Sequence, residues 1–275
     1  MRKLLIIVFI STVGCQQYLK DWTKNYMPDS KAPYGTQILY NHLEELFPKQ
    51  EISNYKTRLH QEWMNDLDSI SINGGDFLVN PEYDKEFVAN NEVTSPDNYV
   101  LNGFVSLSPA DCFAVLALVQ RGSTVLIASP ALPDDLNVFL EPVVSSTTGD
   151  LFQLEALDGP FSLPEIGEYN IIEDKGRFST VIGEENRILL AELNFGAGRL
   201  LYSATPELLT NYSLIDGGAN FIETVFSRFS SNDLNWYSNY RSKDFMSAPS
   251  RETPSYLDYI FEHLSLFIAF MLLFF

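Results

Sequence analysis

Cysteine and histidine are scarce in this sequence, with two cysteines and three histidines among 275 residues. This scarcity argues against a disulfide scaffold and against a zinc site built from Cys and His. Basic residues are also few: 18 Lys and Arg stand against 36 Asp and Glu, which gives a formal net charge of −18. Because proteins hold phosphate backbones with clustered Lys and Arg, this balance argues against nucleic-acid binding.

The sequence also lacks repeats, low-complexity tracts and any apolar run of about 20 residues, the length that a transmembrane helix needs. Hydrophobic residues nevertheless make up 45% of the chain, well above the content of a disordered acidic segment. The length is consistent with two domains of ~150 residues or with one large α/β domain. We expect one α/β domain over 16–235.

The N-terminus has the plan of an export signal. Two basic residues precede an apolar run over 4–10, and small residues follow up to Cys15. We therefore expect an export signal over 1–15. The pair Gly14-Cys15 also matches a bacterial lipoprotein signal, in which the cysteine is lipidated, but Thr12 stands where leucine is usual. Lipidation of Cys15, simple cleavage and retention of the segment all stay open.

The C-terminus is apolar, and residues 264–275 carry no charge. As a helix these residues cover about 18 Å, whereas the hydrocarbon core is ~30 Å thick. We expect a truncated transmembrane helix over 263–275, with a buried or interfacial tail as the alternative, and a juxtamembrane linker over 236–262. Arg2 and Lys3 favour a cytoplasmic N-terminal end, so the acidic domain is expected at the cell membrane on its extracytoplasmic, periplasmic side.

Residues 98–129 form the clearest structural unit. A strand is expected over 99–105, and a second, buried strand over 124–128. Between them, Ser108-Pro109-Ala110-Asp111 combines a capping hydroxyl, a proline at the first helical position and an acid three residues after the cap, which predicts a helix start. Gly122 can end this helix in a left-handed conformation. The order strand, helix, strand predicts a βαβ crossover with parallel strands.

Other segments complete the expected α/β fold. Amphipathic spacing predicts helices over 35–47 and 218–229, and glycines and prolines make 57–97 mostly loop with one or two short strands. Four alternating runs are expected to pair as antiparallel hairpins; they lie at 169–172, 178–182, 188–193 and 199–204. The predicted fold class is therefore α/β, with a mainly parallel sheet, an antiparallel extension and an apolar C-terminal segment.

Three sets of residues resemble a known family: Pro33-Tyr34-Gly35-Thr36, Gly122-Ser123-Thr124-Val125-Leu126-Ile127-Ala128, and Phe195-Gly196-Ala197-Gly198-Arg199 followed by Thr205-Pro206 and Thr210-Asn211-Tyr212. They resemble the membrane-anchored bacterial family called domain of unknown function 4350, usually encoded beside a MoxR-type AAA+ ATPase and von Willebrand factor A-like proteins. The resemblance implies a flavodoxin-like or class I glutamine-amidotransferase-like architecture, generally without the catalytic residues. The signal-like N-terminus and the short C-terminal helix depart from the family's usual anchor.

Candidate nucleophiles are few. A hydrolase elbow carries glycines around its nucleophile, and Val105-Ser106-Leu107-Ser108-Pro109 has none, so Ser108 is expected to be a helix cap. Cys112 falls in an apolar helix, where a thiol behaves as a small hydrophobe. His42, on the apolar side of the first helix, and His263 are expected to pack or to lie at an interface, and the sequence gives His60 no role.

The sequence gives equally weak evidence for ligand-binding sites. Acids around Asp66-Leu67-Asp68, with Asn73, Gly75 and Asp76, hint at a calcium loop, but Ile70 stands where an oxygen ligand belongs. Gly196-Ala197-Gly198 lies between two strand-like runs, which favours a hairpin turn over a nucleotide loop. The aromatic residues Tyr34, Trp236, Tyr237 and Tyr240 suggest packing and bilayer-edge anchors, or a carbohydrate or peptide platform.

From these observations we expect no catalytic, cofactor-binding or metal-binding residue. The favoured function is a membrane-tethered accessory or scaffolding domain of an envelope assembly, with the ATPase system of the resembled family as implied partner. Two alternatives stay open. One is a degenerate hydrolase or amidotransferase-like enzyme that uses Cys112 or Ser108, and the other is a module that binds a cell-wall or sugar ligand.

Overall fold

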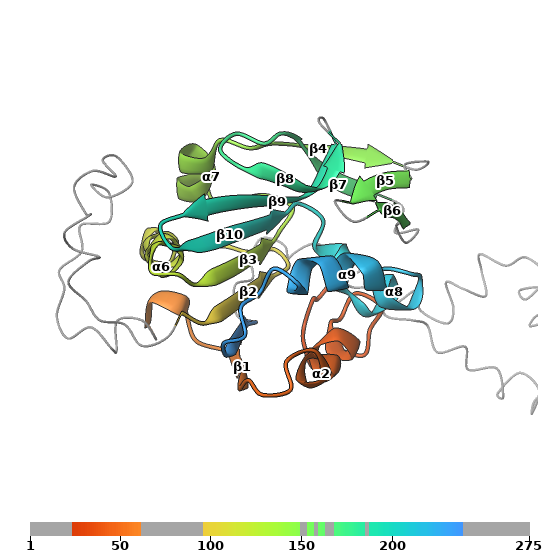
Figure 1. Ribbon diagram of the computed structural model, residues 1–275, viewed down its shortest axis with the longest axis horizontal. Coiled ribbons are helices and arrows are strands. Elements are labelled where there is room, and N and C mark those ends of the chain that lie inside the picture. The colour runs from red at the N-terminus through yellow and green to blue at the C-terminus, as the bar shows by residue number, and fades with distance from the viewer. Residues whose placement is uncertain are drawn as a thin grey trace, which may run out of the picture.

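The computed structural model describes residues 24–61, 96–148, 153–156, 159–162, 168–184 and 187–238. Within these ranges, eleven strands form one mixed sheet with helices on both faces (Figure 1). The strand order is β1-β11-β2-β3-β10-β9-β8-β5-β6, and β7 pairs with β4 and β9 beside this path. The expected α/β class is confirmed, as is the combination of a parallel sheet with antiparallel strands.

The helices are α2 (Gln37–Leu46), α6 (Pro109–Gln120), α7 (Asp134–Leu140), α8 (Asn211–Ile215), α9 (Ala219–Phe226) and the 3-10 helix η1 (Pro206–Leu209). The strands are β1 (Ile52–Tyr55), β2 (Asn98–Asn102), β3 (Thr124–Ala128), β4 (Val143–Thr148), β5 (Gln153–Ala156), β6 (Gly159–Ser162), β7 (Glu168–Asp174), β8 (Ser179–Glu184), β9 (Arg187–Phe195), β10 (Gly198–Ser203) and β11 (Leu234–Tyr237).

The parallel half of the sheet contains β1, β11, β2, β3 and β10. Its centre is the predicted βαβ unit, in which β2 and β3 pair in parallel and α6 connects them. Ser108 and Asp111 form a reciprocal capping box at the start of α6, and Gly122 takes the left-handed conformation after its end with φ 114°. The local signals in the sequence therefore suffice to predict this unit.

Strand β10 joins the two halves, because it pairs in parallel with β3 and antiparallel with β9. The β9–β10 hairpin turns at Gly196, whose φ of 63° suits glycine, and this confirms the hairpin interpretation of Gly196-Ala197-Gly198. The β8–β9 hairpin is also confirmed. The expected β7–β8 hairpin is wrong, since β7 pairs with β4 and with the start of β9.

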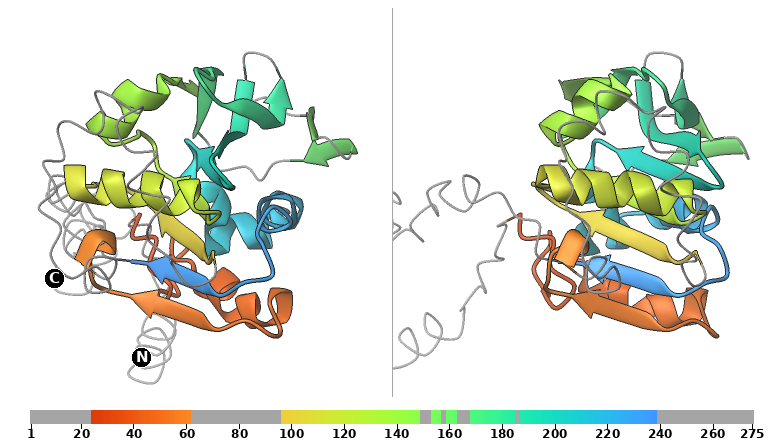
Figure 2. Two further views of the ribbon diagram at one scale, coloured as in Figure 1. Left: turned by 60° about the vertical axis from the view of Figure 1, so that its left-hand side comes forward. Right: turned by 90° about the vertical axis from the view of Figure 1, so that its left-hand side faces the viewer.

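Alternation along the strands divides the core between the two faces of the sheet. One face packs against α6 and α7 and includes Leu101, Val125 and Ile127. The other face packs against α2 and α9 and includes Val100 and Leu126. Figure 2 shows α6 running across the first face, and Figure 1 shows α8 and α9 on the opposite side of the sheet.

Two sheet strands differ from the expectations. β1 was not predicted, and β11 contains Trp236 and Tyr237, which are 0% and 3% exposed between β1 and β2. The predicted linker over 236–262 is therefore wrong at its start, because burial of these aromatic rings makes them part of the sheet. The expected helices over 35–47 and 218–229 are confirmed as α2 and α9, although Leu46 at the end of α2 is 47% exposed.

The predicted features at 1–15, most of 57–97, and 263–275 lie outside the described residues. Within the residues that the structure does describe, no helix combines the length and the apolarity that crossing a bilayer requires.

The Tyr202 side chain provides a test of the core packing. Its ring is fully buried against Phe178, and its hydroxyl has no hydrogen-bond partner among the described residues. Burial of an unpaired hydroxyl costs about 1–3 kcal/mol. We expect Tyr202→Phe to leave the free energy of unfolding unchanged or to raise it by about 1 kcal/mol, measured by urea unfolding.

Tyr26→Phe is the matched control for this substitution, because the Tyr26 hydroxyl does have a partner, Glu207, at 2.8 Å. This control is expected to lose stability. A larger loss for Tyr202→Phe than for Tyr26→Phe would contradict the assignment of an unpaired hydroxyl in the core.

Candidate functional site

The candidate site lies at the N-terminus of α6, where the sequence places Ser108 and Cys112. The Ser108 hydroxyl accepts from the Asp111 backbone N–H at 3.3 Å and donates to Asp111 Oδ2 at 2.7 Å. The Ser108 backbone N–H also donates to Oδ2, at 3.0 Å. Ser108 is thus the helix cap that the sequence predicts.

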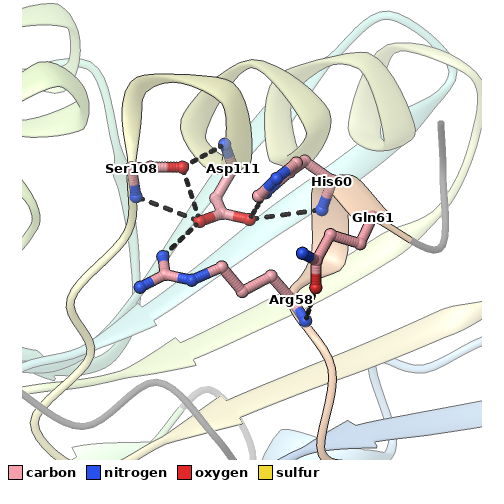
Figure 3. Close-up of polar contacts among 5 residues, drawn as sticks. All are labelled: Arg58, His60, Gln61, Ser108 and Asp111. Carbon is pink, nitrogen blue, oxygen red and sulfur yellow. Dashed lines mark hydrogen bonds and ion pairs between the residues drawn. The ribbon is translucent and has the colours of Figure 1, made fainter.

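Asp111 also contacts the segment that follows β1, although this segment lies far from Asp111 in the sequence. His60 Nδ1 lies 2.7 Å from Asp111 Oδ1, and the His60 backbone N–H donates to the same oxygen at 3.2 Å. Arg58 Nη1 donates to Oδ2 at 3.1 Å. Figure 3 shows the carboxylate enclosed between the helix start on one side and Arg58 and His60 on the other.

The electrostatics of this cluster favour an ionised carboxylate. Burial raises the pKa of Asp111, whose side chain is fully buried, but the hydrogen bonds from His60 and Ser108 together outweigh burial and hold the pKa at about 2. Asp111 therefore stays negatively charged at neutral pH and is a poor proton acceptor.

The order of the groups decides what this cluster can do chemically. In a serine hydrolase triad, the histidine lies between the nucleophile and the carboxylate. Here the carboxylate lies between Ser108 and His60, so the hydroxyl donates to Asp111 rather than to an imidazole. Because Asp111 is a poor base, this arrangement does not activate Ser108 as a nucleophile. It fastens the segment after β1 to the start of α6.

Cys112 offers no better nucleophile. Its side chain is fully buried in the apolar helix. Burial raises the pKa of the thiol to about 12, and the carboxylates of Asp135 and Asp111 add to the rise. Since the thiolate is the reactive form, Cys112 is a core residue, as the sequence suggests.

His42 and His60, the histidines that the structure describes, differ from the expectations. His42 is 58% exposed beside Glu45, at 3.0 Å, so its placement on the apolar side of the helix is wrong. His60 gains a role that sequence reasoning missed, because its partner Asp111 is 51 residues away. His263 lies outside the described residues, and so do Cys15, Tyr240 and the acids around Asp66, Asp68, Asn73 and Asp76.

No group of three or more His, Cys, Asp or Glu side chains that could hold a metal ion occurs in the part of the chain that the structure describes.

Two of the motifs behind the family resemblance meet in space, because the backbone N–H groups of Asn211 and Tyr212 donate to the carbonyls of Gly35 and Pro33 at 2.8 and 2.9 Å. Asn211 Oδ1 accepts from the backbone N–H of Ile38 at 2.8 Å, and Nδ2 donates to the carbonyls of Ser30 and Ala32, both at 2.9 Å. The N-cap residue of α2, Thr36, makes no side-chain cap of its own. Asn211 is therefore a remote cap for α2, a structural role for motif residues.

Among the aromatic candidates that the structure describes, Trp236 and Tyr237 do not form a common platform. Trp236 is fully buried and meets Tyr40 edge-on, with ring centroids 5.8 Å apart. Tyr237 stacks on Tyr55 on the opposite face of the sheet, at 5.1 Å. Packing explains both residues, and neither can offer its ring face to a carbohydrate. Tyr34 is half-buried and lies near the start of the described residues, far from Trp236 and Tyr237 in the sequence.

No family model and no curated protein matches this chain. Solved structures with partial similarity include the exo-β-1,4-mannosidase Op5Man5 from Opitutaceae bacterium strain TAV5, with 15% identity, 50% of this chain and 26% of that chain covered, and a TM-score of 0.36. A β-galactosidase from Bacillus circulans sp. alkalophilus is 12% identical, with 46% of this chain and 23% of that chain covered and a TM-score of 0.29. The N-terminal domain of mmIFT52 is 12% identical, with 65% of this chain and 96% of that chain covered and a TM-score of 0.37.

The chain thus spans about a quarter of the length of the two glycosidases that it partly matches. Scores this low define neither a shared fold family nor a shared activity.

Proposed function

We propose that this protein is a non-catalytic accessory or scaffolding domain that is tethered to a bacterial membrane and works in an envelope assembly. The observation that carries the non-catalytic part is the position of Asp111 between Ser108 and His60. A fully buried carboxylate with a pKa of about 2 occupies the place where an active hydrolase would need a base. The buried Cys112 thiol adds to this support.

The tether in this proposal rests on the sequence. The signal-like residues 1–15 and the uncharged segment 264–275 flank the α/β body. We propose the flavodoxin-like or amidotransferase-like architecture for that body, supported by parallel strands with helices on both faces. The MoxR-type ATPase system and its von Willebrand factor A-like proteins are the proposed partners, from the family resemblance alone.

Fractionation of cells that express the full chain tests the tether. We expect the protein in the membrane fraction, released by detergent but not by high salt, since apolar contacts resist ionic screening. Deletion of 263–275 and the substitution Cys15→Ser, alone and together, identify which end holds the protein. Full-length protein recovered from the cytosol as a monomer without partners would contradict the proposal.

Active-site labelling tests the non-catalytic part separately. Thiol-directed and serine-directed probes are expected to leave Cys112 and Ser108 of the folded protein unmodified, and to label Cys112 only after denaturation. Stoichiometric labelling of either residue in the native protein would instead support the degenerate enzyme.

A further inference from the structure

A second buried carboxylate, Glu207, lies at the carboxyl edge of the parallel strands, in the η1 helix that follows β10. Its side chain is 3% exposed. Oε1 accepts from Lys24 Nζ at 2.7 Å and from the Tyr26 hydroxyl at 2.8 Å. Oε2 is buried and has no hydrogen-bond partner among the described residues. One oxygen of a buried anion thus has two donors and the other has none.

Aromatic groups complete the surroundings of the Lys24 ammonium. Lys24 Nζ lies 5.5 Å from the centroid of the Tyr34 ring, over its face. A carboxylate combined with an aromatic face is the arrangement by which proteins recognise organic ammonium groups. Lys24 itself is 46% exposed, so its ammonium reaches into this environment from a half-exposed side chain.

The side chains beside Glu207 are closely packed. Tyr26 has φ 47°, a left-handed conformation that is costly for an aromatic residue, and its ring meets Phe104 edge-on with centroids 5.7 Å apart. Its side chain covers Gly103, where an added Cβ would approach the ring to 3.0 Å. Backbone strain held by close packing is typical of binding sites, where it positions a polar group. Here that group is the Tyr26 hydroxyl on Glu207.

We propose that Glu207, Tyr26 and Tyr34 form a binding site for a primary ammonium group, and that Lys24 is an internal occupant that such a ligand displaces. A primary ammonium carries three donors. Lys24 satisfies only Oε1, so Oε2 keeps an acceptor for a further donor when a ligand takes the place of Lys24. The site also lies at the carboxyl edge of parallel strands, where open α/β sheets bind their ligands. This inference is independent of the proposed tether.

Chemical rescue tests the site in the full chain. n-Butylammonium and N-acetyl-lysine-methylamide are titrated into wild type and into Lys24→Ala at constant ionic strength, with binding followed by calorimetry and thermal unfolding. We expect both amines to stabilise Lys24→Ala and to bind wild type about tenfold more weakly, because the tethered Lys24 competes at an effective concentration in the millimolar range. Tighter binding of n-butylammonium would identify a free amine as the natural occupant. Tighter binding of N-acetyl-lysine-methylamide would identify a lysine side chain.

Three controls separate this site from general effects of salt or solvent. n-Butanol, a neutral compound of similar size, is expected to have no effect. Glu207→Gln in the Lys24→Ala background should abolish binding; if that double variant does not fold, Tyr34→Leu in the same background should weaken binding instead. Arg228→Ala, which removes a cation 3.6 Å from the buried Glu192, should gain no stability from the amines.

Failure of both amines to stabilise Lys24→Ala would overturn the proposal. Binding to Lys24→Ala without any binding to wild type would overturn it too, because the Lys24–Glu207 pair would then be a permanent structural contact.

Discussion

Asn211→Ala is expected to lower the free energy of unfolding by about 3 kcal/mol, because it removes three hydrogen bonds from one nearly buried side chain. The backbone N–H of Ile38 at the start of α2 would lose its acceptor, and the carbonyls of Ser30 and Ala32 would lose their donor. Urea unfolding of the full chain measures the change. Helix α2 should lose amide protection first, since its remote cap is gone.

Two substitutions control this experiment. Asn194→Ala makes the same change at an exposed strand position, where it removes a single hydrogen bond, from Nδ2 to Glu192 Oε1 at 3.1 Å, and is expected to cost about 1 kcal/mol. Asn211→Asp keeps the acceptor for Ile38 but sets a carboxylate oxygen against the carbonyls of Ser30 and Ala32, so its cost should equal or exceed that of Asn211→Ala. Equal costs for Asn211→Ala and Asn194→Ala would show that the remote cap does not stabilise α2.

Asp111→Ala is expected to cost about 4 kcal/mol at neutral pH, since it leaves Arg58 and the backbone donors of Ser108 and His60 facing an empty space. Ser108→Ala, which removes only the cap hydroxyl, should cost about 1 kcal/mol. A comparable loss in the two variants would mean that the contacts to Arg58 and His60 contribute little.

The same carboxylate should also produce a pH dependence. The folded pKa of about 2 lies below the ordinary value of 3.8, so the stabilisation is complete above pH 3.8 and is lost as the pH falls through 2. Linkage gives about 2 kcal/mol for this difference. Because Asp111→Asn does not titrate, we expect its unfolding free energy to fall less between pH 5 and pH 2 than that of wild type. Parallel pH profiles would contradict the assigned pKa.

Local chemistry explains which parts of this fold could be predicted from the sequence. The βαβ unit depends on signals within a few residues, namely the Ser108 cap, Pro109, Asp111 and Gly122. The β9–β10 hairpin depends on Gly196 in the same way. In each case the backbone conformation is decided by neighbours along the chain, and the sequence shows those neighbours directly.

Contacts between distant residues explain what could not be predicted. Nothing local relates His60 to Asp111 or Asn211 to Ile38, because each contact joins a side chain to a partner in another element. The same holds for β11, whose Trp236-Tyr237 pair is equally compatible with a membrane-edge linker until β1 and β2 are seen on either side. The Glu207 site could not be predicted either, because its two donors, Lys24 and Tyr26, come from the opposite end of the described chain.

The place of β11 in the sheet has a consequence for the biosynthesis of the protein. Its neighbours β1 and β2 are made early, but the gap between them is filled only by residues 234–237. While the ribosome is still translating the antiparallel half, β1 and β2 each present an edge with open backbone groups, which invites pairing with other chains. A nascent chain halted before residue 234 keeps both edges open, so it should depend on chaperones until translation passes this point.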